Sequence, residues 1–176
     1  MSKILATQLN GLYQKIVQNE EDAIEQTARL LAQASVGEGS VYFACFDELQ
    51  GIESYALSNK EQPFLNLVKW SPDAEIRETD RVLIFAKSCQ DTEALQLAKK
   101  LYEQFIPFAA VASEVPSNDN ELSDLAYTYI SMHVRGGLIP HPTNLGERVV
   151  IPHLHAGLFI YEAIKLAYDE MLEDEI

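Results

Sequence analysis

The sequence has 176 residues, of which 47% are hydrophobic, so the chain is long enough and apolar enough to form one domain with a substantial core. Its formal net charge of −14 at pH 7 argues against a nucleic-acid-binding protein, because phosphate neutralisation requires clustered Lys and Arg. The same charge argues against docking on anionic membranes, but it leaves room for a small phosphorylated ligand that is held by local donors.

The sequence also bears on the cellular compartment. It contains no run of about 18 apolar residues that could cross a membrane, and residues 1–12 lack the order of regions found in a signal peptide. Cys45 and Cys89 fit neither a zinc-binding spacing nor a disulfide framework. We therefore expect a cytoplasmic protein in which both cysteines are reduced and no membrane is involved.

Residues 1–36 are predicted to be helical, because apolar side chains recur three and four residues apart. The stripe of the first predicted helix is Leu5, Leu9, Leu12 and Ile16, and that of the second is Ile24, Ala28 and Leu31. The acidic stretch at residues 19–22 is expected to separate the two helices. Gly37 and Gly39 are expected to end the second one.

The rest of the chain alternates between strands and helices. Apolar runs predict strands at residues 40–46, 63–70, 81–86, 107–113 and 127–131, and amphipathic segments predict helices at 47–58, 91–105 and 152 to about 172. Residues 132–150 contain many Gly and Pro residues and are expected to be an irregular loop. The apolar positions of the last helix cover two faces, which predicts packing on the sheet and also on another helix or subunit, most simply in a two-fold dimer.

These elements predict the fold class and its layers. Strands without polar alternation are typical of a parallel sheet that is covered on both faces. We expect an α/β three-layer sandwich with a mostly parallel five-stranded sheet, in one domain over residues 1–176. Residues 1–36 would form its N-terminal helical segment, and residues 37–176 the α/β core with a long C-terminal helix.

Parallel sheets bind ligands at the carboxyl ends of their strands, so the segment after the 81–86 strand is of interest. There, Ser88, Cys89, Gln90, Asp91 and Thr92 form a polar turn before a helix. A helix N-terminus offers free backbone amides and can hold a phosphate. In the alternative interpretation, Ser88 or Asp91 only caps the helix. An ionised Asp91 that pointed into the turn would repel a phosphate.

The segment "TDRVLIFAKSCQDTEALQLAKKLYEQFIPFAAVAS" resembles the sugar isomerase (SIS) domain family. Members typically have an aspartate before an apolar strand, then a Ser-x-Ser-Gly-x-Thr-x-Glu loop that opens a helix. Asp80, Ser88, Thr92 and Glu93 match that pattern, and "LSDLAYTYI" resembles a second family phrase. The resemblance covers roughly residues 20–172 and is closest to a bacterial branch near the phosphoheptose isomerase-like members. It implies a SIS/flavodoxin-like fold and a sugar-phosphate ligand.

The sequence departs from the family pattern at both ligand loops. Ala86 and Cys89 replace a serine and a glycine of the second loop, and the first loop appears as "ACFDE" without glycine. Without glycine, the backbone loses positive φ angles and close approach to a ligand, so the grip on phosphate is expected to be weaker. The positions that phosphoheptose isomerases use for metal or base chemistry fall near Ser54, Ser58, Val150 and Leu158, none of which can serve.

Candidate catalytic residues come from two places. The segment "HPTNLGER" resembles the active-site segment of arabinose 5-phosphate isomerase-like members, which makes His141 a candidate and Arg148 a partner for phosphate or carboxylate. Asp47 and Glu48 follow the first strand directly. Glu48 could be a base for proton transfer next to a carbonyl, and Asp47 could contact the ligand or cap the next helix.

The sequence supports three functional hypotheses. The first is a sugar-phosphate isomerase that works through an enediol without a cofactor or metal ion. The second is a non-catalytic protein that senses a phosphosugar or a similar anion. The third is a purely structural or interaction protein. In all three, we expect a homo-oligomer that forms through the C-terminal helix.

Overall fold

The computed structural model describes residues 1–174. Its main sheet has five parallel strands in the order β2-β1-β3-β4-β5. The strands are β1 (Val41–Cys45), β2 (Leu67–Val68), β3 (Arg81–Phe85), β4 (Phe108–Ala112) and β5 (Thr128–Ser131). The predicted α/β class, with a parallel five-stranded sheet between helices, is confirmed.

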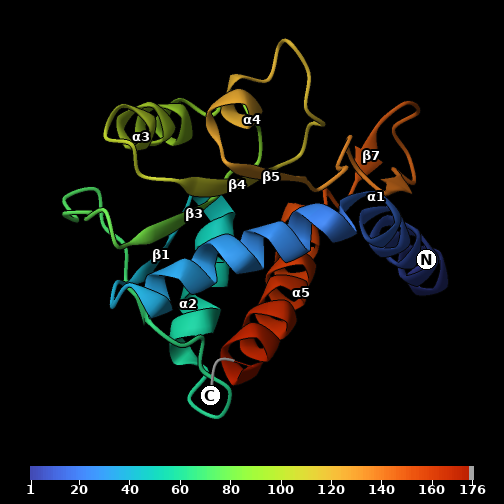
Figure 1. The fold of residues 1–176 in the computed structure, drawn as a ribbon. Helices are drawn as coiled ribbons and strands as arrows, with labels where there is room; N and C mark the ends of the chain where they lie inside the picture. Colours follow the sequence, from blue (N-terminus) through green and yellow to red (C-terminus); the bar gives the residue numbers. More distant parts are fainter. Residues whose placement is uncertain (175–176) are drawn as a thin grey trace.

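Helices cover both faces of the sheet. One face carries α1 (Ser2–Val36), α2 (Gln50–Ser58), which follows the 3-10 turn η1 (Asp47–Leu49), and α5 (His153–Asp174). The other face carries α3 (Thr92–Glu103) and the short α4 (Glu121–Leu125). Figure 1 shows this division, with α3 and α4 on one side of the strands and α1, α2 and α5 on the other.

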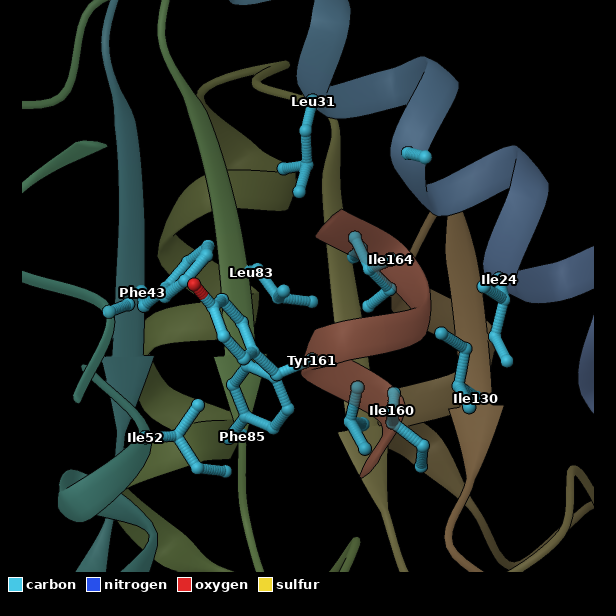
Figure 2. Packing of buried hydrophobic residues seen from close by; sticks show 14 of the residues in the cluster. Ile24, Leu31, Phe43, Ile52, Leu83, Phe85, Ile130, Ile160, Tyr161 and Ile164 are labelled. Carbon is cyan, nitrogen blue, oxygen red and sulfur yellow. The ribbon is translucent and has the colours of Figure 1, made fainter. Parts of the chain in front are cut away.

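The larger core lies between the sheet and the α1–α2–α5 layer. Successive strand residues point to opposite faces, so Phe43 and Phe85 point into this core, whereas Ala44 and Ile84 point into the smaller one under α3. Figure 2 shows Ile160, Tyr161 and Ile164 of α5 packed over strand residues of the sheet. Complete burial of one such side chain contributes about 1.5–3 kcal/mol, so this layer fixes α5 firmly on the sheet.

The predicted break between two N-terminal helices is wrong, because α1 is continuous from Ser2 to Val36. Glu20 lies within the acidic stretch, but its side chain turns inward and its Oε1 accepts a hydrogen bond from the backbone N–H of Ser131 (2.7 Å). The Glu20 side chain thus provides the acceptor for a backbone N–H at the end of β5, and α1 continues past it without a break. The second apolar face of α5 packs against α1, so the predicted contact with another helix is confirmed.

Three further elements differ from the sequence prediction. The second strand covers only Leu67–Val68 rather than residues 63–70. Residues 132–150 are not wholly irregular, because β6 (Ile139–Pro140) and β7 (Arg148–Val149) pair as a small antiparallel sheet. The helix α4 was not predicted; the side chain of Asn120 caps it by accepting from the backbone N–H of Ser123 (3.0 Å).

Asp80 fixes the amino ends of β1 and β3. Its carboxylate is fully buried and accepts from the backbone N–H groups of Ser40 and Arg77, each at 2.8 Å. Burial alone would raise the pKa of this carboxyl, but these hydrogen bonds and the Arg77 guanidinium hold it below its ordinary value. The aspartate that the family pattern places before this strand is therefore a structural anchor.

Candidate functional site

The carboxyl ends of β1, β3 and β4 meet at one edge of the sheet. Asp47 and Glu48 follow β1, Lys87 and the polar turn 88–92 follow β3, and Glu114 follows β4. Parallel pairing in register brings these strand ends together, although they lie far apart in the sequence. This edge is where an open parallel sheet is expected to bind a ligand.

Within the turn, Asp91 caps α3. Its Oδ1 accepts from the backbone N–H of Ala94 (2.9 Å), so its carboxylate is held by the first turn of the helix. The hydroxyl of Ser88 accepts from the backbone N–H of Gln90 (3.1 Å), which tightens the turn. Of the two interpretations of Asp91, the structure shows the cap.

The turn already holds an oxyanion, the carboxylate of Glu114. The backbone N–H of Cys89 donates to Oε2 of Glu114 over 2.7 Å. Partial burial would raise the pKa of Glu114, but hydrogen bonds from Cys89 and from the Ser88 side chain lower it, which keeps the carboxylate ionised. Burial and the same carboxylate raise the pKa of the Cys89 thiol to about 11, so this thiol stays protonated and able to donate.

Glu114 was not among the residues predicted from the sequence. It comes directly after Ser113, the last residue of the predicted strand and one residue past the end of β4, and that position could have identified it, since the residues after each parallel strand reach the same edge. The missing information was the distance to Cys89, which depends on the pairing of β3 with β4.

Glu48, Lys87 and His153 form a charged cluster beside this turn. Oε2 of Glu48 lies 3.0 Å from Nζ of Lys87, and its Oε1 lies 4.0 Å from Nδ1 of His153, at the start of α5. A hydrogen bond from its own backbone amide and the pairing with Lys87 lower the pKa of Glu48. Burial lowers the pKa of His153, which leaves its imidazole neutral near pH 7. A neutral imidazole beside a carboxylate and an ammonium can accept or relay a proton.

The remaining predicted residues of this edge lie around the cluster. Asp47 is exposed, with a left-handed φ of 54°, and its charge helps to raise the pKa of Lys87, after the larger effect of Glu48. The side chain of Gln90 donates to the backbone carbonyl of Asp119 (3.0 Å). Thr92 begins α3, where backbone amides have no acceptor within the helix.

His141 and Arg148 belong to the small β6–β7 sheet and its connecting turn. Nδ1 of His141 accepts from the backbone N–H groups of Asn144 (2.9 Å) and Thr143 (3.2 Å), so the imidazole shapes the connecting turn. Nε and Nη2 of Arg148 donate to the carbonyls of Gly137 and Leu138, each at 2.7 Å. Their roles toward a ligand stay predictions.

Glu20 and His133 form a buried pair of a carboxyl group and an imidazole at the C-terminal end of β5. His133 has a left-handed φ of 54°, and its Nε2 lies 3.6 Å from Oε1 of Glu20 and has no hydrogen-bond partner within residues 1–174. Burial raises the pKa of Glu20 and lowers that of His133, so it shifts each group toward its neutral form. Within residues 1–174, no group of three His, Cys, Asp or Glu side chains is placed to hold a metal ion.

Cys45 and Cys89 are both buried and free. Among the helices of residues 1–174, none is long and apolar enough to cross a membrane. The cytoplasmic location stays a prediction.

Solved structures of other proteins share this fold. Phosphoheptose isomerase GmhA from Neisseria gonorrhoeae superposes with a TM-score of 0.69 at 12% identity, over 96% of this chain and 98% of that one. The Vibrio vulnificus NanR protein, complexed with ManNAc-6P, superposes with a TM-score of 0.62 at 12% identity, over 98% of this chain and 67% of that one. At this identity the likeness shows the fold, and it confirms the predicted phosphoheptose isomerase-like SIS architecture.

The sequence itself has relatives of full length. The uncharacterized protein YwjG of Bacillus subtilis is 34% identical over 175 residues, which cover 99% of each chain. The family described as "Domain of unknown function (DUF2529)" matches residues 1–172, and the chain therefore belongs to this family.

Proposed function

We propose that this chain is a SIS-type protein that binds a small phosphorylated sugar, or a similar anion, through the turn at residues 88–92. One observation carries the proposal: the turn already holds an ionised carboxylate, that of Glu114, on the backbone N–H of Cys89. A backbone that is shaped to hold one oxyanion without a glycine can hold another. We call this oxyanion site, formed by the backbone of the turn at residues 88–92, the cradle. The missing glycine of the family pattern therefore does not abolish it.

A phosphate would enter this cradle by replacing Glu114. The displaced carboxylate is only partly buried, so it can turn toward solvent. Lys87 lies next to the turn, and α3 directs its first backbone amides at the same edge, so the entering phosphate gains positive charge and donors there. The names of the structural neighbours, a phosphoheptose isomerase and a protein complexed with ManNAc-6P, agree with a sugar phosphate as ligand.

The cluster beside the turn supports acid–base chemistry on such a ligand. An aldose–ketose isomerisation through an enediol moves one proton between neighbouring carbons and needs a base close to both. His153, neutral and beside Glu48, is the base that the geometry favours, and Glu48 would orient the imidazole and stabilise its charged form. His141 stays the second candidate, on the β6–β7 turn.

Binding without turnover is the competing function, and one observation favours it. Glu48, the base predicted from the sequence, is engaged by Lys87 over 3.0 Å and kept ionised, as expected of a structural ion pair. In that case the protein would report on a phosphosugar and not transform it.

Thermal shift and calorimetry with paired ligands test binding. Pentose, hexose and heptose phosphates are compared with the same sugars without phosphate, and a ligand at 100 times its dissociation constant should stabilise the protein by about 2.7 kcal/mol. Lys87→Ala should weaken binding of the phosphorylated member of each pair. Lys100→Ala, on an exposed part of α3 away from the edge, is the matched control. Equal binding of both members of every pair, or no binding of any, would overturn the proposal.

Isomerase assays over the bound sugar phosphates decide between the two functions. Turnover that is lost in His153→Ala, with binding retained, supports an isomerase. Turnover lost only in His141→Ala moves the catalytic role to the β6–β7 turn. Binding without turnover of any ligand supports a sensor.

A further inference from the structure

The first eleven residues of the chain form a helical arm that is not covered by the rest of the molecule. None of residues 1–11 is buried, and Leu12 is the first residue of α1 that is. Apolar side chains nevertheless recur along one face of this arm, at Met1, Ile4, Leu5 and Leu9. Figure 1 shows these turns, in dark blue, at the side of the molecule. The apolar stripe of this arm is exposed to water, so its burial against a surface would be favourable.

A groove between α1 and α5 offers such a surface. It has a volume of about 630 Å³ and runs from Val17 to Arg29 along α1 and from Phe159 to Asp174 along α5. Its apolar lining includes Ile24, Phe159, Ala163, Leu166 and Met171. Leu166 is 73% exposed, although it lies in the middle of a helix that is otherwise packed on the core.

The charges of the arm and the groove are complementary. The groove is lined by the carboxylates of Glu21, Glu25, Glu170 and Asp174, against the single cation Arg29, which is paired with Glu25 over 2.8 Å. The arm, residues 1–11, contains Lys3 and no Asp or Glu, in a chain whose net charge is −14. The amino-terminal part of α1 is thus the amphipathic helix of this protein that bears a positive charge and lacks acidic residues. It fits the acidic groove in sign.

The lengths also correspond. At 1.5 Å per residue, residues 1–11 span about 16 Å, and the α1 wall of the groove from Val17 to Arg29 spans about 18 Å. A chain cannot place its own arm in its own groove, because the arm is the N-terminal part of the same helix that forms the groove wall. A second copy of the chain can do so, and a two-fold axis makes the exchange reciprocal and closed.

We propose that two copies of this chain form a dimer in which the arm of each, residues 1–11, lies in the α1–α5 groove of the other. This arrangement buries the apolar stripe of both arms and the exposed Leu166 of both grooves. It also specifies the oligomer that the sequence predicted only as an association through the C-terminal helix, because α5 supplies one wall of the groove. The proposal does not depend on the ligand of the candidate site.

Analytical ultracentrifugation of full-length variants tests the exchange. Leu166→Asp places a charge in the groove, and the double change Ile4→Asp with Leu9→Asp places charges on the arm. Since none of these side chains is buried, the variants should fold. Each variant alone should raise the dimer dissociation constant at least tenfold. Tyr102→Asp, on an aromatic side chain of α3 that is 59% exposed, should leave the dimer unchanged.

Mixing the two variants gives a sharper result. The intact arm of the Leu166→Asp chain fits the intact groove of the arm variant, so the mixture should form a heterodimer with one of the two contacts and dissociate less readily than either variant alone. A direct contact between the two α5 helices would instead leave the arm variant dimeric. A monomeric wild-type chain, or a dimer that the arm variant does not weaken, would overturn the proposal.

Discussion

Replacement of Glu114 by alanine should make the protein less stable and at the same time make it bind phosphate more tightly. In the free protein, Glu114 holds the backbone N–H of Cys89 over 2.7 Å and so competes with any ligand for the same donor. The alanine variant leaves that donor without its acceptor, which costs stability. It also leaves the donor available to a ligand, which favours binding.

The hydrogen bond sets the size of both effects. A hydrogen bond to a charged group contributes about 1.5–3 kcal/mol, so Glu114→Ala should lower the free energy of unfolding by that amount. Because each 1.4 kcal/mol corresponds to a factor of ten, the affinity for a phosphate that displaces the carboxylate should rise about 10- to 100-fold. Glu114→Gln retains a neutral acceptor, so its affinity gain should be smaller, about fivefold.

Urea unfolding and calorimetric titration with inorganic phosphate and with sugar phosphates measure the two effects on the same variants. Glu121→Gln is the matched control, because the ion pair of Glu121 with Lys99 over 3.5 Å is exposed, so the change should affect neither quantity. A Glu114→Ala variant that binds phosphate no more tightly than the wild type would show that the turn is not the phosphate site. The order alanine, glutamine, glutamate in decreasing affinity is the expected result.

Three other predictions concern the scaffold. Asp80→Ala leaves the part-buried backbone N–H groups of Ser40 and Arg77 without their acceptor, so the free energy of unfolding in urea should fall by about 3 kcal/mol, and a loss below about 1 kcal/mol would contradict the anchoring role. Burial raises the pKa of Glu20, so the contribution of this carboxyl to stability is present below about pH 4.5 and is lost as the pH rises through its pKa in the folded state. Glu20→Gln should therefore gain stability relative to the wild type from about pH 5 to about pH 8. A difference in the free energy of unfolding between the two proteins that stays constant with pH would refute this. Gly39→Ala would bring a Cβ to 1.9 Å from the carbonyl oxygen of Thr79 and should destabilise the fold by about 3 kcal/mol, which a melting temperature equal to that of the wild type would disprove.

Local patterns predicted much of the fold, because each rests on neighbours in the sequence. The apolar runs of β1, β3, β4 and β5 fall where they were expected, since a strand buried on both faces carries no polar alternation. The prediction of a helix break at the acidic stretch around Glu20 was wrong because the contact that decides it is distant in the sequence. Its partner, the backbone N–H of Ser131, is 111 residues away, and nothing near Glu20 in the sequence announces it.

Some features of the candidate site could likewise be predicted from the sequence, and others could not. The turn after β3 and the cap at Asp91 could be predicted as alternatives from the residue types alone, since a cap is a contact over three residues. The tertiary structure decided what the turn holds and what lies next to it. Glu114 reaches Cys89 across 25 residues because β4 pairs with β3, and His153 reaches Glu48 because α5 begins at the same edge of the sheet. Periodicity and capping act over a few residues, so they can be predicted from the local sequence. Which charged side chains lie together at the sheet edge depends on strand order and register, and only the tertiary structure fixes these.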